Sequence, residues 1–191
     1  MDNELTFEPF PKLARLNREC VITEKIDGTN AQLVFSATGA LLVGSRKRQI
    51  HPEGTREKGS DNFGFAGWAY ENRALLFDFL GEGRHYGEWA GGRIQRGYGL
   101  EQKRFFLFAT HRFPSESIPP ELKGAGLDAV PLLYEGPFCS ETVDTEMENL
   151  RRHSRVNDYH NPEGVVVYHT ALKRSFKVTF EHDHTGKGEN R

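Results

Sequence analysis

The first candidate for chemistry in this sequence is a lysine that stands two residues before an aspartate. Residues 24–30 read Glu-Lys-Ile-Asp-Gly-Thr-Asn, so the lysine is Lys25 and the aspartate is Asp27. A lysine can attack phosphorus only after its ammonium group loses a proton, which burial or neighbouring cations favour. Taken alone, the segment is typical of a hairpin turn, because Asp-Gly between apolar residues is a strong hairpin signal.

Four later segments also combine acidic, aromatic and basic residues. The segments are Tyr-Gly-Glu-Trp-Ala-Gly at 86–91, Arg-Phe-Phe-Leu-Phe at 104–108, Pro-Glu-Gly-Val-Val at 162–166 and Arg-Ser-Phe-Lys-Val at 174–178. Glu163 is the expected metal ligand, because Mg²⁺ accepts one or two carboxylates together with water and phosphate oxygens. Glu88 can accept a hydrogen bond from a ribose hydroxyl, and a role at the metal is its alternative. Lys177 and Arg46 are the cations expected near Lys25, where they would neutralise phosphate charge.

The apolar pattern predicts that an α+β domain positions these residues. Strands are predicted at 20–23, 31–35, 41–43, 85–89, 104–110, 163–169 and 174–180, and helices at 65–80 and 142–152. The first three strands would form an antiparallel meander, and residues 115–131 would form a surface connection with a short helical turn. Strands dominate and no βαβ array is visible, so antiparallel sheets are expected. One domain is predicted over residues 1–180, followed by a polar tail at 181–191 that would fray.

The composition fits one soluble domain. The 191 residues are 37% hydrophobic and include 14 phenylalanines, which is enough for a real core. The net charge of −2 does not by itself indicate a nucleic-acid-binding protein, although basic residues cluster at 46–48 and 93–104. An acidic start and the lack of long apolar runs predict a cytoplasmic protein with no membrane contact. Cys20 and Cys139 lack metal-binding spacing and are expected to be buried thiols.

Taken in order, the segments resemble the motifs of ATP-dependent RNA ligases. Lys-x-Asp-Gly at 25–28 resembles the nucleophile motif that these ligases share with capping enzymes, and 24–30 resembles the RNA-ligase branch more closely. Residues 86–91 with 94–100 are similar to the third motif of ligases that seal nicks in duplex RNA. The segments at 104–108, 162–166 and 174–178 resemble the nucleobase-stacking strand and the fourth and fifth motifs, and Gly44-Ser45-Arg46 stands where the family has an arginine. Each match is weak alone, but five in the family order are specific.

The resemblance implies a fold, a reaction and a set of site residues. The fold would be the nucleotidyltransferase (ATP-grasp-like) core of two antiparallel sheets with flanking helices. With ATP and Mg²⁺ (or Mn²⁺), Lys25 would take AMP and pass it to a nucleic-acid 5′-phosphate, and a 3′-hydroxyl would then displace AMP. The implied catalytic residues are Lys25, Asp27 and Lys177. The implied nucleotide-binding residues are Glu24, Lys25, Ile26, Asn30, Arg46, Glu88, Phe106, Glu163 and Lys177, with Glu163 and Glu88 at the metal. The implied nucleic-acid-binding residues are Asn30, Arg46, Lys47, Arg48, Arg93 and Arg96.

Several assignments leave alternatives open. The resemblance selects Phe106 for the adenine stack, but a shift of one residue would select Phe105 instead. Glu24 is expected to accept a hydrogen bond from the adenine amino group, which would favour ATP over GTP. The alternative activities are a minimal DNA nick ligase, a GTP-using capping-type transferase and a non-catalytic module that binds nucleotides or nucleic-acid ends. The substrate would be a nicked duplex or RNA ends.

The sequence also departs from the family pattern in two places. The fifth motif usually has a second lysine in Lys-x-Lys spacing, whereas Ser175 and Thr179 stand at that spacing from Lys177. Lys173 or Arg174 could replace it. The sequence ends at residue 191, soon after the fifth motif, so the appended nucleic-acid clamp of duplex-sealing ligases is expected to be missing. A protein partner could then replace that clamp.

Overall fold

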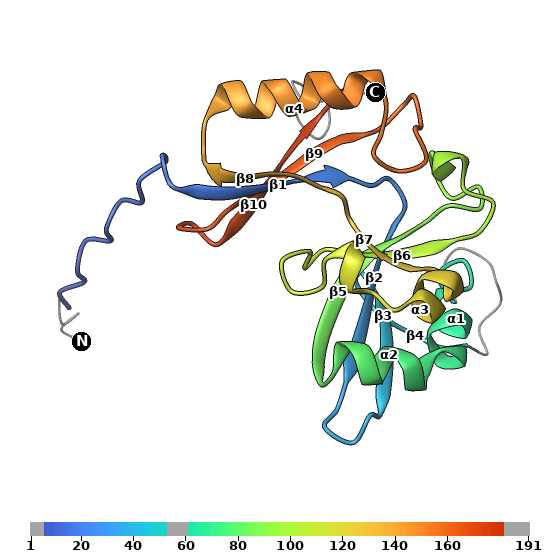
Figure 1. The fold of residues 1–191 in the computed structure, drawn as a ribbon. Coiled ribbons are helices and arrows are strands. Elements are labelled where there is room, and N and C mark those ends of the chain that lie inside the picture. Colours follow the sequence, from blue (N-terminus) through green and yellow to red (C-terminus); the bar gives the residue numbers. More distant parts are fainter. Residues whose placement is uncertain (1–5, 53–60, 182–191) are drawn as a thin grey trace, which may run out of the picture.

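The computed structural model describes residues 6–52 and 61–181, and it contains two β-sheets with helices packed on their outer faces (Figure 1). The strands are β1 (Glu19–Lys25), β2 (Thr29–Phe35), β3 (Leu41–Ser45), β4 (Gln49–Ile50), β5 (Gly83–Ala90), β6 (Arg104–Leu107), β7 (Leu127–Ala129), β8 (Leu132–Pro137), β9 (Gly164–His169) and β10 (Arg174–Thr179). The helices are α1 (Phe65–Glu71), α2 (Arg73–Leu80), α3 (Pro120–Ala125) and α4 (Ser140–Arg152), with short 3₁₀ turns η1 (Gly97–Gly99) and η2 (Ser115–Ser117). The predicted α+β class is confirmed.

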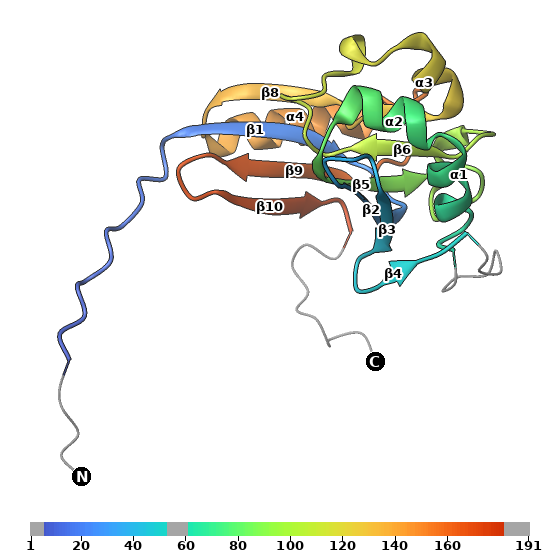
Figure 2. The ribbon, with the colours of Figure 1, turned by 90° about the horizontal axis from the view of Figure 1, so that it is seen from below.

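The four-stranded sheet carries the end of β1, where Lys25 lies. Its strand order is β10-β9-β1-β8, with every pair antiparallel, and Figure 2 shows the four strands side by side. Helix α4 packs on one face, where its Val143 and Leu150 meet Ile22 of β1 and Val165 of β9. Because side chains alternate along a strand, Lys25 points to the opposite face of the sheet.

The six-stranded sheet carries the remaining candidate residues. Its order is β4-β3-β2-β5-β6-β7, in which β6 and β7 run parallel and the other pairs are antiparallel. Helices α1 and α2 cover one face, and their Phe65 and Leu76 join Leu33 of β2 in the larger core cluster. The alternation of side chains turns Asn30 of β2 and Glu88 of β5, which lie opposite each other, to the face that these helices leave open.

The expected meander is wrong for its first strand. β2 pairs with β3 as predicted, but β1 pairs with β8 and β9 in the other sheet. Residues 26–28 therefore cross between the two sheets instead of turning back as a hairpin. Close packing at the crossover demands a glycine at residue 28, because a Cβ atom there would lie 2.5 Å from the carbonyl oxygen of Trp89. The hydrophobic alternation predicted both β1 and β2, but it does not determine which strands each of them pairs with.

The other differences are local. The helix predicted at 65–80 divides into α1 and α2 at Asn72, whose side-chain amide donates to the carbonyl oxygen of Trp68 and competes with the helical pattern. The predicted surface connection at 115–131 contains β7 as well as the helical turn. Cys20 is buried as expected, but Cys139 is exposed.

The described part of the chain has no membrane-crossing helix. None of the helices in residues 6–52 and 61–181 is long and apolar enough to span a membrane. Of the tail predicted at 181–191, only Glu181 belongs to the described residues, so the predicted fraying lies outside them.

Candidate active site

The candidate nucleophile lies where the two sheets meet. Lys25 is the last residue of β1 and pairs with Gly164, the first residue of β9. This pairing brings Glu163 beside Lys25, and Nζ of Lys25 lies 2.5 Å from Oε2 of Glu163. The two side chains are 24% and 19% exposed, so the ion pair is reachable from solvent. Gly164 lets the end of β10 pack closely against the start of β9, because its φ is +147° and a Cβ atom would collide with the carbonyl oxygen of Val178.

Glu88 approaches the same point from the six-stranded sheet. It accepts hydrogen bonds from the backbone N–H of Gly28 at 3.2 Å and from Nδ2 of Asn30 at 3.0 Å. Burial raises the pKa of Glu88 to about 7, although the positive charge of Lys25 and the bond from Gly28 oppose that rise. The negative charges of Glu163 and Asp27 raise the pKa further. Three carboxylates from three segments therefore influence one another around Lys25.

Asp27 is held by an arginine. Nε of Arg96 lies 3.3 Å from Oδ2 of Asp27, and the same guanidinium lies 3.4 Å from Oε2 of Glu181 and donates to the carbonyl oxygen of Asn161 at 3.1 Å. The side chain of Arg96 is only 14% exposed. Arg96 was expected to contact nucleic acid, but the structure engages it with Asp27 beside the nucleophile.

The carboxylates fit a divalent cation, with phosphate and water supplying most of its ligands. Among the described residues, no three His, Cys, Asp or Glu side chains form a cluster that could hold a metal. Oε2 of Glu163, however, is buried and accepts no hydrogen bond from that part of the chain, although it pairs with Lys25. Mg²⁺ takes one or two carboxylates and completes its shell with water and phosphate oxygens. Glu163 and Glu88 are suited to that demand.

Two cavities open beside Lys25, and both are lined by Lys25, Asn30 and Phe108. One, of about 610 Å³, is also lined by Arg46 and Lys177, and we call it the basic cavity. The other, of about 470 Å³, is lined by residues of both sheets, and we call it the apolar cavity because Val21, Ile26, Val130 and Val166 form part of its wall; Glu24 and Glu88 line it as well. Cationic side chains bind phosphate groups, and an apolar wall can bind the flat ring of a nucleobase. The two cavities together therefore have the chemistry of a nucleotide-binding site.

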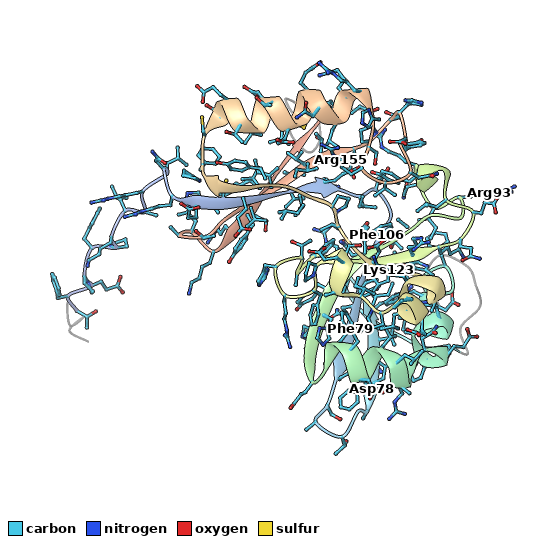
Figure 3. The ribbon with its side chains drawn as sticks, viewed as in Figure 1. Asp78, Phe79, Arg93, Phe106, Lys123 and Arg155 are labelled. Carbon is cyan, nitrogen blue, oxygen red and sulfur yellow. The ribbon has the colours of Figure 1, made fainter. Side chains whose placement is uncertain are left out.

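Phe108, and not the expected Phe106, is the phenylalanine at these cavities, where Tyr86 lines the basic cavity and Tyr168 the apolar one. Phe106 is 2% exposed and packs with Ile26 and Tyr98 in a core cluster between the sheets (Figure 3). Phe105, the alternative, packs against Phe65 on the helix-covered face. Phe108 is 45% exposed and lines both cavities. It follows the end of β6 but still donates its backbone N–H to Tyr86, so it keeps the strand direction and shares a face with Phe106.

Glu24 is held by the segment that follows α4 and also lines the apolar cavity, so its contact with the adenine amino group stays a prediction. Its carboxylate lies on the face of β1 opposite Lys25 and accepts hydrogen bonds from Oγ of Ser154 at 2.5 Å and the backbone N–H of Arg155 at 2.9 Å. Burial raises the pKa of Glu24, and these two hydrogen bonds oppose the rise. The carboxylate therefore fastens the chain that follows α4, where Figure 3 shows Arg155.

The expected nucleic-acid-binding residues divide into two groups. Arg46, Lys47 and Arg48 are exposed in the turn between β3 and β4, and Arg46 also reaches the basic cavity. Arg93 is exposed on the loop after β5, and Figure 3 shows it pointing away from both sheets. Asn30 is engaged with Glu88 inside the site.

Tyr98 is a site residue to which the sequence analysis assigned no role. Its hydroxyl group hydrogen-bonds to the backbone of Lys25 and Asp27, directly beneath the nucleophile. The only signal in the sequence was its position in residues 94–100, which extend the resemblance of the third motif.

Comparison with known proteins identifies the family and the fold of this chain. The family model described as RNA ligase matches residues 18–179. Two mutants of Naegleria gruberi RNA ligase, one solved with ATP and Mn and one with AMP and Mn, are each 20% identical to this chain with a TM-score of 0.58, and each match covers 86% of this chain and 50% of that one. A third mutant, with ATP and Mn, has 20% identity and a TM-score of 0.57 over 92% of this chain and 53% of that one. This chain thus spans about half the length of those ligases.

At this level of identity, the solved structures show that the fold is shared. No match to this chain was found among curated proteins. The family model, however, covers most of the sequence, including Lys25, Glu88, Glu163 and Lys177. The chain belongs to the RNA ligase family.

Proposed function

We propose that this chain is the adenylylating part of an ATP-dependent RNA ligase that joins 5′-phosphate and 3′-hydroxyl ends. The observation that carries the proposal is the position of Lys25, whose amine lies beside Glu163 at the edge of both cavities. A non-catalytic binding module would have no use for a reachable amine at that point. The Naegleria ligases solved with ATP and Mn or with AMP and Mn support the choice of nucleotide.

In the first step, Nζ of Lys25 attacks the α-phosphorus of ATP. The new bond is N–P, the bond that breaks joins the α-phosphorus to the oxygen bridging to the β-phosphate, and pyrophosphate leaves. The amine releases its proton to solvent before it attacks. Lys177 and Arg46, which line the basic cavity with Lys25, are placed to neutralise the charge that builds on the phosphate oxygens.

The later steps transfer AMP to the nucleic acid and then release it. An oxygen of the 5′-phosphate attacks the phosphorus of lysyl-AMP, the N–P bond breaks, and Lys25 recovers its amine. A 3′-hydroxyl then attacks the 5′-phosphate, loses its proton, and displaces AMP. Lys25 serves only the first two steps.

Glu163 and Glu88 would hold the divalent cation, Mg²⁺ or Mn²⁺. Bound there, the cation would act as a Lewis acid that withdraws negative charge from the phosphate oxygens. Asp27 would stay oriented by Arg96, because their side chains already form an ion pair.

The apolar cavity would receive the adenine ring, with Phe108 as its stacking partner. This assignment replaces Phe106, which is buried in the core. Arg46, Lys47, Arg48 and Arg93 would contact the phosphates of the RNA, because they remain exposed around the basic cavity and on the loop after β5. A partner protein that helps to grip the RNA stays a prediction.

Labelled nucleotide tests the proposal directly. The protein is incubated with Mg²⁺ and either α-labelled ATP or α-labelled GTP, and intact mass shows whether one AMP is added. We expect label from ATP alone, an adduct at Lys25, and joining that is more efficient with RNA than with DNA ends, because a ligase of RNA can read the 2′-hydroxyl. Label from GTP would support a capping-type transferase, and no adduct with either nucleotide would support a binding module.

A further inference from the structure

Tyr98 is a fully buried tyrosine whose hydroxyl group meets the backbone on both sides of Ile26. The hydroxyl donates to the carbonyl oxygen of Lys25 at 3.2 Å and accepts from the backbone N–H of Asp27 at 3.2 Å. The residue is 0% exposed. Burial raises the pKa of Tyr98, so the hydroxyl stays protonated and able to donate. The side chain of Tyr98 thus links the backbone of Lys25 to that of Asp27.

Tyr98 is itself held firmly. Nδ2 of Asn157 donates to the carbonyl oxygens of Tyr98 and Gly99, each at 3.2 Å. The ring of Tyr98 packs on that of Tyr159, with centroids 5.1 Å apart and an angle of 44° between the planes. The backbone of Tyr98 has a φ of +50°, a left-handed conformation that a side chain of this size rarely adopts. The surrounding contacts therefore maintain an unfavourable backbone conformation that aims the ring at the crossover.

Besides the packing of Ile26 in the core, few polar contacts among the described residues hold the crossover. Residues 26–28 pass between the sheets, where sheet hydrogen bonds cannot fix them. Among the described residues, the polar contacts at this point are the two bonds to Tyr98, the bond from Gly28 to Glu88 and the ion pair of Asp27 with Arg96. Tyr98 and Arg96 both lie on the loop between β5 and β6, so this loop holds the nucleophile segment at its backbone and at its acidic side chain.

We propose that Tyr98 is a positioning residue that sets the direction of the Lys25 amine for attack on the α-phosphorus of ATP. This inference rests on the proposed function. Attack requires the reacting atoms to lie close together and in line, and a displacement of about 1 Å can lower the rate about 100-fold. Loss of the hydroxyl leaves the N–H of Asp27 without its partner in the interior, which favours a shift of the crossover. The joining of an end that already carries AMP does not use the Lys25 amine and is expected to be spared.

The test compares two tyrosines of the same aromatic pair. Tyr98→Phe removes the hydroxyl that holds the crossover, and Tyr159→Phe is its matched control, because the Tyr159 hydroxyl has no hydrogen-bond partner among the described residues. Three quantities are measured for each variant: the single-turnover rate of adenylylation over a range of ATP concentrations, the joining of pre-adenylylated 5′-ends, and Tm.

We expect Tyr98→Phe to lower the adenylylation rate at saturating ATP about tenfold to 100-fold, with little change in the ATP concentration that gives half the maximal rate. Joining of pre-adenylylated ends should stay within about twofold of wild type, and Tyr159→Phe should leave both reactions unchanged. An equal loss of both reactions in Tyr98→Phe would show a general structural role and overturn the inference. Adenylylation at the wild-type rate would overturn it as well.

A second variant keeps the test decisive if Tyr98→Phe does not fold. Asn157 is exposed, and Asn157→Ala loosens the loop without touching the Tyr98 hydroxyl. It should show a smaller loss confined to adenylylation, and an unchanged adenylylation rate would count against the inference. Failure of the proposed function would give a different result, because the wild-type protein itself would then form no adduct with ATP.

Discussion

The amine of Lys25 lies 2.5 Å from the carboxylate of Glu163, across the pairing of β1 with β9. Two residues that are far apart in the sequence are therefore brought into contact by the fold. Both side chains are partly exposed, so a phosphate group can reach the pair without unfolding the core. The geometry implies that each residue matters for the first step and that their losses can be measured separately.

Lys25→Ala should abolish the AMP adduct, because Lys25 lines both cavities, whereas Lys177 lines the basic cavity, where it is expected to neutralise phosphate charge. The measurement is intact mass after incubation with ATP and Mg²⁺. Joining from ATP should be lost together with the adduct, whereas pre-adenylylated 5′-ends should still be joined to some extent. An adduct on the Lys25→Ala protein would contradict the assignment of the nucleophile.

Glu163→Ala and Lys177→Ala should each lower the rate of adenylylation by two orders of magnitude or more, about 3 kcal/mol of transition-state stabilisation. Removal of the Glu163 carboxylate would take away a ligand of the cation. Removal of the Lys177 amine would leave negative charge on the phosphate unneutralised. Rates are followed by single-turnover labelling, with Tm as the folding control. Glu163→Asp should recover only partly at raised Mg²⁺, because its carboxylate is one methylene shorter. Near-wild-type labelling of either alanine variant would remove that residue from the site.

Phe106 and Phe108 should respond to alanine in opposite ways. Phe108→Ala should raise the ATP concentration needed for half-maximal labelling about tenfold or more, because base stacking contributes about 1–3 kcal/mol, while Phe108→Tyr should behave like wild type. Phe106→Ala should instead lower the free energy of unfolding by about 3–5 kcal/mol, since its ring is buried. Urea unfolding and ATP titrations of both variants separate the two effects. A selective loss of ATP affinity in a stable Phe106→Ala protein would restore the original assignment.

Arg93 and Arg96 should also behave differently, although only three positions separate them. Arg93 is exposed, so Arg93→Glu should weaken RNA binding and joining, leave the adduct intact, and reduce the log–log salt slope of binding by about one. Arg96 pairs with Asp27, so Arg96→Ala should lower adduct formation itself. Fluorescence binding at several salt concentrations and labelling with ATP provide the two measurements. An unchanged adduct in Arg96→Ala would show that the ion pair with Asp27 has no part in the first step.

His85 should make the fold sensitive to mild acid. Burial lowers the pKa of His85, its hydrogen bond to the carbonyl oxygen of Gly81 opposes that change, and the charge of Arg112 lowers the pKa further. The unfolded chain therefore binds a proton more readily, so the stability present above the ordinary histidine pKa of about 6.5 is lost as the pH falls from there toward the lowered folded value. Urea unfolding at pH 7.5 and 5.5 measures the loss. His85→Gln should show a smaller pH dependence, and an unchanged dependence would exclude His85 as its source.

The sequence by itself was enough to predict the class of the fold and the candidate chemistry. Strands and helices such as β9, β10 and α4 were predictable because apolar alternation and helical spacing are local properties. The motif order pointed to the RNA ligase family, which the family match to residues 18–179 confirms. Lys25, Glu88 and Glu163 were named from residue type and motif position, and the structure brings them together; their roles stay proposals.

Contacts between distant segments were decided only by the tertiary structure. Asp-Gly at 27–28 has the same local signal in a hairpin and in a crossover, and the choice depends on whether β1 finds more favourable partners in β8 and β9 than in β2. The same holds for side chains: Phe106 and Phe108 share one strand face, but packing of the crossover buries the first and leaves the second at the cavities. Tyr98 could not be found from its own neighbours in sequence, because its hydrogen bonds reach a segment that only folding places beside it.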